Sequence, residues 1–235
     1  MAVFLFSLRD HFPVFMKILI LGATGRTGKL LLEQALKAGI LVHALVRDTD
    51  KVKVIDRNLK LYESKTLDRT ALRLAMQGCD AVLSTLSISR KSEFPWSGLK
   101  SPKDFLSHTL RNVLEIANEL HIRRIIITTA WGVHETKKDI PGWFRFLINY
   151  SNVGAAYRDH EIQENLLQAS PTDWTIVRPV GLTNSRKNRK IRLTTHNQPK
   201  PSLTISRSNV AKFMVEIYKT GDYKQEAVTV SEVRG

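Results

Sequence analysis

An apolar segment that runs directly into a glycine-rich turn constrains the fold of this chain more than any other feature. Residues 17–21 read KILIL, the turn at residues 22–28 reads GATGRTG, and a helical pattern follows over residues 29–38. A strand, a Gly-x-x-Gly-x-x-Gly turn and a helix in this order are typical of a dinucleotide-binding unit. The segment therefore predicts a nucleotide site close to the N-terminal end of the chain.

The three glycines of the turn have separate physical roles. Gly22 permits the tight turn, Gly25 lets the backbone approach a pyrophosphate, and Gly28 lets the helix pack close to the strand. The N-terminus of the helix offers N–H groups and a partial positive charge to phosphates. A turn that only connects two elements is the alternative, and the flanking strand and helix favour nucleotide binding. The expected cofactor contacts in the turn are Gly22, Thr24, Gly25, Arg26, Thr27 and Gly28.

The end of the second predicted strand indicates which nucleotide binds. Residues 40–46 form an apolar run that closes on Arg47. An acidic residue at this point of such a fold binds the 2′-hydroxyl of NAD, whereas an arginine accommodates the 2′-phosphate of NADP. We therefore predict NADP(H), with Arg26 of the turn assisting Arg47. Two alternatives remain: Asp48 presents an acid if the strand ends one residue later, or Arg47 is a solvated strand end.

Apolar runs and helical patterns alternate along the rest of the chain, which predicts a parallel sheet with crossover helices. The predicted fold class is therefore α/β, with a Rossmann-like doubly wound sheet. Leu86, at the end of the predicted fourth strand, is a further expected cofactor contact. The other predicted strands are residues 59–62, 81–86, 124–129 and 174–177, with short segments at 191–193, 203–205 and 227–230, and the other predicted helices are residues 67–76, 103–120, 161–169 and 209–218.

The length of 235 residues fits one domain, which we place at residues 16–235. Residues 1–15 form an N-terminal extension that is too short to span a bilayer and lacks the features of a secretory signal. The extension is either an ordered arm or untranslated, with synthesis starting at Met16, and we favour the second. The single cysteine, Cys79, excludes an internal disulfide, favours a cytoplasmic location and is expected in the core rather than as a nucleophile.

The net charge of +14 is the main anomaly of the composition. Basic residues concentrate at residues 186–192, 123–124 and 137–138. Such clusters attract polyanions, including a phosphorylated cofactor, an acidic substrate or nucleic acid. No zinc finger, helix-turn-helix or aromatic stacking run accompanies them in the sequence. We therefore expect solvated surface and cofactor attraction, with nucleic-acid binding as the less favoured alternative and no membrane partner.

Three segments together resemble a known family: the turn GATGRTG, the strand end LVRD at residues 45–48, and DWTIVRP at residues 173–179. From about Met16 to its C-terminus the chain resembles the atypical short-chain dehydrogenase/reductases, and among them the NAD(P)H-binding NmrA-like proteins and the small flavin and biliverdin-IXβ reductases. The resemblance implies a small C-terminal extension on the substrate side, and adenine contacts at Thr66 and Leu67. It also implies NADPH-dependent hydride transfer to a small conjugated acceptor of the flavin or quinone type. The alternative is a non-catalytic NADP(H)-binding redox sensor.

The catalytic residues of conventional relatives are missing from their expected places. Those relatives use a serine after the fifth strand and a Tyr-x-x-x-Lys pair, whereas this chain has Thr129 there, and Tyr157 is followed four residues later by Glu161. In the relatives' Lys-x-x-x-Glu pattern, the lysine position falls on His160. A histidine can bind a ribose and donate a proton near neutral pH, and the alternative is a surface histidine at a helix start. The candidate catalytic residues are His160, Tyr157 and Thr129.

Two aromatic-rich segments, residues 87–101 and 131–158, follow the fourth and fifth predicted strands. Ligands bind outside the carboxyl ends of the strands in open α/β sheets. The aromatic side chains form either a lid over an apolar acceptor or a cover for the core, and the sequence favours neither. The expected partner is a small-molecule acceptor, bound by a monomer or a small homo-oligomer.

Overall fold

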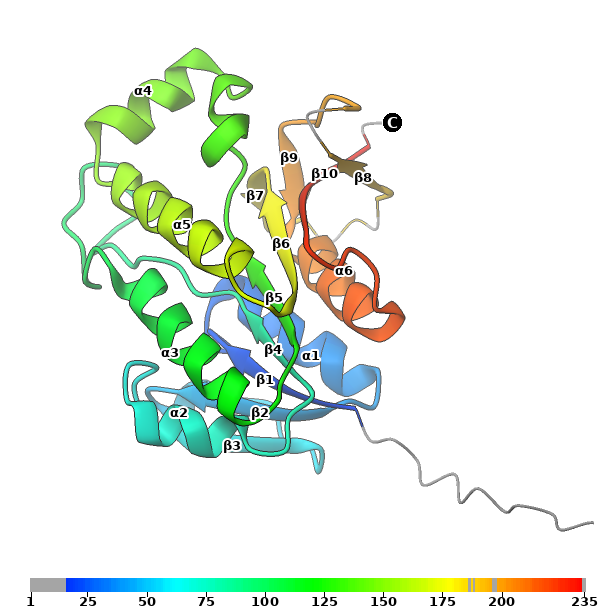
Figure 1. Ribbon diagram of the computed structural model, residues 1–235. Coiled ribbons are helices and arrows are strands. Elements are labelled where there is room, and N and C mark those ends of the chain that lie inside the picture. The colour runs from blue at the N-terminus through cyan, green and yellow to red at the C-terminus, as the bar shows by residue number, and fades with distance from the viewer. Residues whose placement is uncertain (1–15, 186, 188, 196–197, 234–235) are drawn as a thin grey trace, which may run out of the picture.

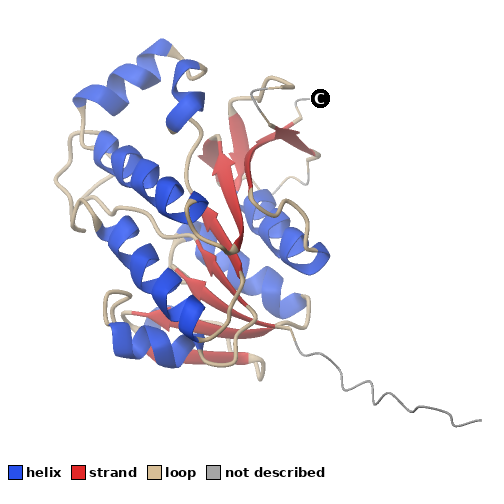
Figure 2. Cartoon of the chain, viewed as in Figure 1, coloured by secondary structure: helices blue, strands red, loops and turns tan. Residues whose placement is uncertain are grey.

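The computed structural model describes residues 16–185, 187, 189–195 and 198–233 (Figure 1). An open sheet runs through the centre, and helices cover both of its faces (Figure 2). The fold class predicted from the sequence is therefore confirmed. The predicted N-terminal extension, residues 1–15, lies outside the described residues.

The main strands and helices follow the alternation that the sequence predicts. No helix of the described ranges is long and apolar enough to cross a bilayer. The strands are β1 (Lys17–Leu21), β2 (Leu41–Val46), β3 (Leu59–Glu63), β4 (Ala81–Ser84), β5 (Arg124–Thr128), β6 (Asp173–Pro179), β7 (Gly181–Thr183), β8 (Ile191–Thr194), β9 (Thr204–Ser206) and β10 (Glu226–Glu232). The helices are α1 (Arg26–Lys37), α2 (Arg69–Met76), α3 (Phe105–Glu119), α4 (Gly142–Tyr150), α5 (Val153–Gln168) and α6 (Arg207–Thr220), with short 3-10 helices η1 (Thr49–Lys51) and η2 (His134–Lys138).

The strand order of the main sheet is β3-β2-β1-β4-β5-β6-β10-β8, which is the doubly wound order extended by two strands. Neighbouring strands pair in parallel, except that β8 is antiparallel to β10. The strand order reverses between β1 and β4, so the connections that follow these two strands leave in opposite directions. Ligands of open α/β sheets bind at such a switch point, and the glycine turn follows β1 there.

Alternate residues of β1 enter two different cores. Ile18 and Ile20 belong to the core under α1 and α6, whereas Leu19 and Leu21 belong to the core under α2, α3 and α5. All four side chains are buried. Because successive side chains of a strand point to opposite faces, a continuous apolar run indicates a strand covered on both faces. Figure 1 shows this arrangement, with α3 and α5 on one side of the sheet and α1 and α6 on the other.

Two helices differ from the sequence-based prediction. Helix α5 spans Val153–Gln168 instead of residues 161–169, because its buried face carries polar residues that weaken the apolar periodicity. The segment before it, expected to be irregular through residue 158, also contains α4. Helix α1 begins at Arg26 rather than at Lys29, because the threonine and glycine in its first turn obscure the helical pattern without preventing a helix.

The C-terminal part of the chain adds a small unit beside the main sheet. Strand β7, which the sequence did not predict, pairs in parallel with β9. Helix α6 starts directly after β9, where the Ser206 hydroxyl caps it by accepting a hydrogen bond from the backbone N of Asn209. This unit lies next to the carboxyl end of β6 (Figure 1), which is the place expected for the C-terminal extension.

Candidate functional site

The glycine turn has the close packing that its sequence pattern predicts. Gly22 has a φ of +87°, in the left-handed region that favours glycine, and its carbonyl accepts a 2.9 Å hydrogen bond from the backbone N of Gly25. A Cβ atom on Gly28 would lie 1.9 Å from the carbonyl oxygen of Gly22. Position 28 therefore accepts glycine alone in this geometry, and α1 starts close against the end of β1.

The first turn of α1 is open to an anion. Its N-cap residue, Gly25, is exposed and offers no side chain, and the first turn contains no acidic residue. Backbone N–H groups without an intrahelical partner and the positive end of the helix dipole therefore face outward. Thr24 and Thr27, two further predicted contacts, are half-buried in the same turn. This geometry suits a pyrophosphate.

The chain that follows β4 forms the neighbouring wall of the turn. The backbone N of Thr85 donates to the Leu21 carbonyl at 3.0 Å. The backbone N of Leu86 lies only 3.2 Å from the place that a Cβ on Gly22 would take. Leu86 is thus brought against the turn and remains half-buried.

Arg47 follows β2 and is exposed, with no hydrogen bond or ion pair to any residue that the structure describes. Its neighbour Asp48 is already engaged, because its carboxylate caps η1 at the backbone N of Asp50, at 3.0 Å, and pairs with Lys51 Nζ at 2.9 Å. The hydrogen bond from Lys51 holds the pKa of Asp48 below its usual value. Of the two residues that the sequence left open, Arg47 is therefore the one available to a ligand.

Arg26 does not lie beside Arg47, contrary to the sequence-based prediction. Its Nη1 atom pairs with Oε1 of Glu93 at 2.6 Å, in the segment that follows β4. In the sheet, β4 flanks β1 on one side and β2 flanks it on the other. Arg26 is therefore paired on the β4 side of the glycine turn, whereas Arg47 follows β2 on the other side of β1.

Thr66 and Leu67 follow β3 at the same edge of the sheet. Thr66 is buried, and its hydroxyl is within 3.2 Å of the Thr109 hydroxyl on α3. Leu67 is half-buried. The Thr66 side chain is thus committed to packing, which leaves the backbone of this segment and the Leu67 side chain to meet an adenine ring.

A buried ion pair organises the region after β5. Arg178 of β6 donates from Nε and Nη2 to the two carboxylate oxygens of Glu164, at 3.0 and 2.6 Å, and the two side chains are 3% and 0% exposed. The Thr129 hydroxyl donates to the same carboxylate at 2.6 Å. Burial alone would lower the pKa of Arg178, but the hydrogen bonds and charges of Glu164 and Glu135 raise it above its usual value. The hydroxyl of Thr129 is therefore engaged in holding α5 against β5 and β6.

Sequence reasoning missed this network, although one signal was present. Arg178 directly follows the apolar residues Ile176 and Val177 in a buried strand, and a buried arginine requires a carboxylate partner. The second partner, Glu135, lies in η2 and is half-exposed. Burial acts against it, but the hydrogen bond and charge of Arg178 hold the pKa of Glu135 below its usual value.

His160 lies in the middle of α5 and is only 5% exposed, so it is not a surface histidine at a helix start. Its Nδ1 atom is 3.0 Å from Oε1 of Gln163, whose Nε2 donates to the Leu106 carbonyl. Burial lowers the pKa of His160 below its usual 6.5, although the carboxylates of Glu164 and Asp159 oppose the shift. The ring is therefore neutral at pH 7. Its Nε2 atom has no hydrogen-bond partner within the described part of the chain.

Tyr157 is fixed in a packing role by its surroundings. Its hydroxyl donates to the Trp131 carbonyl at 3.3 Å, and its ring makes an edge contact with Phe144. Burial raises the pKa of Tyr157 above its usual value. The phenol is therefore a weak acid whose proton already has an acceptor.

The two aromatic-rich segments meet beyond the carboxyl ends of the strands. Trp96 Nε1 donates to the Tyr150 carbonyl at 2.8 Å, and the backbone N of Asn152 donates to the Pro95 carbonyl at 3.0 Å. Phe144 and Tyr157 pack against the core, so some of the aromatic residues do cover it. The exposed aromatic residues of the two segments are Phe94, Trp96, Trp143, Phe146 and Tyr150.

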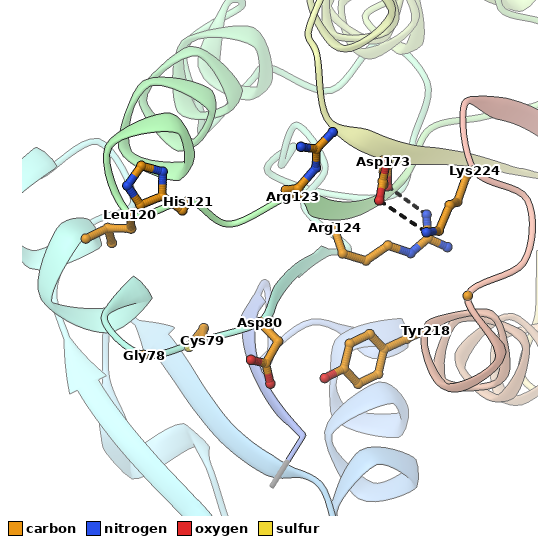
Figure 3. Close-up of a pocket in the computed structure, with 11 residues that line it drawn as sticks. Gly78, Cys79, Asp80, Leu120, His121, Arg123, Arg124, Asp173, Tyr218 and Lys224 are labelled. Atoms are coloured by element: carbon orange, nitrogen blue, oxygen red, sulfur yellow. Dashed lines mark hydrogen bonds and ion pairs between the residues drawn. The ribbon is translucent and has the colours of Figure 1, made fainter. Parts of the chain in front are cut away.

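A cavity of about 520 Å³ lies at the other end of the strands, where β4, β5 and β6 begin (Figure 3). Arg124 at its wall donates from Nη2 to the carbonyls of Ile217 and Asp222, which complements the C-terminal end of α6. Cys79, also at this wall, is buried, and burial raises the pKa of its thiol to about 12. Cys79 is thus a core residue, as expected, and the cavity is remote from the glycine turn.

The basic segments noted in the sequence lie on separate elements. Arg124 is buried at the start of β5, Lys137 and Lys138 end η2, and Arg192 belongs to the edge strand β8. Arg186 and Asn188 of the longest segment lie outside the described residues. The cations therefore do not line up along a single helix or strand.

Comparisons with known proteins agree with this geometry. A curated relative, the oxidoreductase GME11367 of Pestalotiopsis microspora, is 29% identical over 181 residues, and the match covers 70% of this chain and 66% of the relative, so the chain spans about two thirds of the relative's length. A short-chain dehydrogenase/reductase of Veillonella parvula, solved in complex with NADP, superposes with a TM-score of 0.76 at 16% identity, covering 92% of this chain and 94% of that one. The anaerobillin reductase ChuY of Escherichia coli has a TM-score of 0.76 at 20% identity, covering 94% of this chain and all of that one (100%).

The structural neighbours establish the fold, and a family model establishes the membership. The model for NAD(P)H-binding proteins matches residues 22–220, from the first glycine of the turn to the end of α6. The glycine turn, the open helix N-terminus and the switch point all lie within the matched range. The chain belongs to the NAD(P)H-binding family.

Proposed function

We propose that the protein is an NADPH-dependent reductase that transfers a hydride to a small conjugated acceptor of the flavin or quinone type. The observation that carries this proposal is the placement of an open, glycine-lined helix N-terminus at the switch point of the sheet, at the same edge as a free aromatic surface. Family membership supports the cofactor class, and the similarity to a curated oxidoreductase supports the type of reaction.

The preference for NADPH rests on Arg47. Its guanidinium is exposed at the end of β2, and the adjacent Asp48 is occupied by η1 and Lys51. A charge-assisted contact between Arg47 and a 2′-phosphate would contribute about 1.5–3 kcal/mol, which is roughly ten- to hundredfold in affinity.

The other residues of the site would each bind a different part of the cofactor. The nicotinamide ring, when bound, supplies the hydride. The turn from Gly22 to Gly28 would hold the pyrophosphate, Leu67 the adenine and Leu86 the central part of the nucleotide. His160 would bind the ribose through Nε2. The neutral ring donates its Nδ1–H to Oε1 of Gln163, so Nε2 carries no proton and would accept a hydrogen bond from a ribose hydroxyl.

The exposed aromatic residues favour a flat, conjugated acceptor. Trp96 and Tyr150 belong to segments that a hydrogen bond ties together, and the exposed rings pair within each segment, Phe94 with Trp96 and Phe146 with Tyr150. Aromatic walls bind planar ring systems by stacking and by burial of apolar area. A flavin or quinone meets this requirement, and each can accept a hydride while solvent supplies the proton.

The direct test is consumption of NADPH in the presence of a panel of flavins and quinones. The proposal expects turnover with at least one acceptor. It also expects His160→Ala to lower turnover and weaken NADPH binding together, by about 1–2 kcal/mol for one lost hydrogen bond. Turnover and NADPH affinity at the wild-type values in His160→Ala would remove this residue from the site.

A second candidate function is a non-catalytic NADP(H)-binding sensor. The observation in its favour is that the Thr129 hydroxyl is engaged by Glu164 and the Tyr157 hydroxyl by the Trp131 carbonyl, so neither is a free acid. The same assay discriminates the two functions. Tight NADPH binding without turnover across the whole panel would support the sensor and contradict the reductase.

A further inference from the structure

The side chain of Arg26 meets a carboxylate that a structured hairpin carries to the glycine turn. Arg26 Nη1 lies 2.6 Å from Glu93 Oε1. The hairpin is closed by a bridge between Arg90 and Leu99 and by a 2.9 Å hydrogen bond from the backbone N of Ser92 to the Ser97 hydroxyl. Glu93 therefore sits at the tip of a defined hairpin rather than in a loose loop.

The hairpin is itself anchored to the body of the protein. Trp96 Nε1 donates to the Tyr150 carbonyl, and the side chain of Asn152 donates to the carbonyls of Trp96 and Ser97 at 3.0 and 3.2 Å. These bonds fix the tip relative to the junction of α4 and α5. The position of the Glu93 carboxylate next to the turn is thus set by the fold.

A second arginine, Arg207, faces the same place from α6. Helices α1 and α6 pack side by side (Figure 1), and each runs from the carboxyl edge of the sheet back toward its amino edge. Their first residues, Arg26 and Arg207, therefore lie at the same edge. Arg207 is 9% exposed, and its Nη1 is held by Asn184 Oδ1 at 2.7 Å. Its Nε and Nη2 atoms have no hydrogen-bond partner among the described residues.

The charges of Arg26 and Glu93 both affect the pKa of Arg207. Burial is the main cause that lowers the pKa of Arg207, the charge of Arg26 lowers it further, and the charge of Glu93 opposes both. Two cations and one carboxylate leave a net positive charge. The first turns of α1 and α6 contain no acidic residue, so the two helix N-termini add to this positive field.

We infer that Arg26 and Arg207 form an anion subsite beside the glycine turn that binds a pyrophosphate oxygen of the cofactor, and that Glu93 competes with this oxygen for Arg26. The inference deepens the proposed nucleotide site and rests on it. Arg26 is 60% exposed and Glu93 82% exposed, so solvent screens their pairing and it contributes little. A phosphate at a helix N-terminus gains the backbone N–H groups and the helix dipole as well, and it therefore displaces the carboxylate.

The test is titration of the full-length protein with NADP⁺ and with NAD⁺, followed by calorimetry. Arg207→Gln should weaken both nucleotides by the same factor, about tenfold, because the pyrophosphate is common to them. Glu93→Gln should tighten both severalfold, and this gain should vanish when Arg26 is also replaced by glutamine. Arg192→Gln is the matched control, because it removes one positive charge from β8, which is separated from β1 by the four strands β4, β5, β6 and β10.

Wild-type affinity for both nucleotides in Arg207→Gln, or a weakening of NADP⁺ alone, would overturn the subsite. Should Arg207→Gln fail to fold, the Glu93→Gln and Arg26→Gln double-mutant cycle decides, and additive effects would overturn the competition. Failure of the inference is distinct from failure of the proposed function. In the first case the wild-type protein still binds NADP⁺ tightly, and in the second it binds neither nucleotide.

Discussion

The glycine turn and the region around Thr129 lie at the same edge of the sheet, yet different kinds of contact hold them in place. The turn is fixed by neighbouring residues, through the hydrogen bond from Gly25 to Gly22 and the contact of Gly28 with the same carbonyl. The region around Thr129 is fixed by side chains far apart in the chain, because Thr129 and Glu164 are 35 residues apart and Arg178 and Glu135 are 43 apart.

This difference has a functional consequence. A locally built turn can bind the phosphate part of a nucleotide in any chain that keeps its few glycines and the helix after them. The second region can vary without disturbing the turn, and here a buried ion pair engages the Thr129 hydroxyl. We therefore expect substitutions in the turn to weaken nucleotide binding and substitutions around Thr129 to lower stability without weakening it.

The largest expected effect on stability is that of Glu164→Ala. The substitution leaves Arg178 buried without its main carboxylate and leaves the Thr129 hydroxyl without an acceptor. Removal of one partner of a buried pair costs about 3–5 kcal/mol of unfolding free energy, measured by urea denaturation. The folded fraction should still bind NADP⁺, because the turn does not depend on this pair.

Glu135→Gln is the matched control for this prediction. Glu135 contacts the same arginine but is half-exposed, so its loss should change the unfolding free energy by about 1 kcal/mol or less. Equal losses of unfolding free energy in Glu164→Ala and Glu135→Gln would contradict the account of the network. They would show that the buried carboxylate contributes no more than the half-exposed one.

Gly28→Ala should weaken NADP⁺ binding, which Glu164→Ala should leave intact. Its Cβ would lie 1.9 Å from the Gly22 carbonyl, which forces α1 away from β1. We expect a stability loss of about 1–3 kcal/mol from overpacking, together with a marked loss of NADP⁺ affinity in calorimetry. Gly142→Ala is the control, because no atom lies within 4 Å of the Cβ that it would add. Unchanged NADP⁺ affinity in Gly28→Ala would contradict the assignment of nucleotide binding to the turn.

A smaller effect is expected in the dependence of stability on pH. The pKa of His160 is lowered below 6.5 by burial, so at pH values below about 6.5 the unfolded chain takes up the proton more readily than the folded one. This residue therefore destabilises the protein as the pH falls, and the lowered pKa of the buried His43 acts in the same direction. His160→Gln should flatten the fall in the unfolding free energy between pH 6.5 and 5 (about 1.5 pH units).

Replacement of the exposed His108 by glutamine is the control for the loss of a histidine. The account expects no flattening in that variant. The same fall in stability for wild type and His160→Gln would mean that His160 takes up its proton as readily in the folded chain as in the unfolded one, and would contradict its burial.

The same contrast between local and long-range contacts explains how much could be predicted from the sequence. The sheet, α1 and the switch point follow from patterns within short segments, such as the alternation of Ile18 and Leu19 between two cores. Helix α5 was predicted at half its length because its buried face is polar. Its polar residues make sense only when α3 and β6 are packed against it, as where Asp159 accepts hydrogen bonds from the backbone N atoms of Leu106 and Ser107.

The candidate site shows the same division. The positions of Gly22, Gly25 and Gly28 could be predicted because each has a local geometric requirement. The direction of Arg26 could not, because it depends on Glu93, a residue brought to the turn by a hairpin that is anchored at the junction of α4 and α5. Arg207 was missed for the same reason, since no motif near it in the sequence points to the turn.

The central claim is that the glycine turn and Arg47 together bind NADP(H), and one measurement tests it most directly. The dissociation constants of NADP⁺ and NAD⁺ are determined for the wild-type protein and for Arg47→Ala. The account predicts that wild type prefers NADP⁺ by roughly ten- to hundredfold and that Arg47→Ala loses this preference while NAD⁺ affinity stays the same. Equal affinities in wild type, or an unchanged ratio in Arg47→Ala, would contradict it.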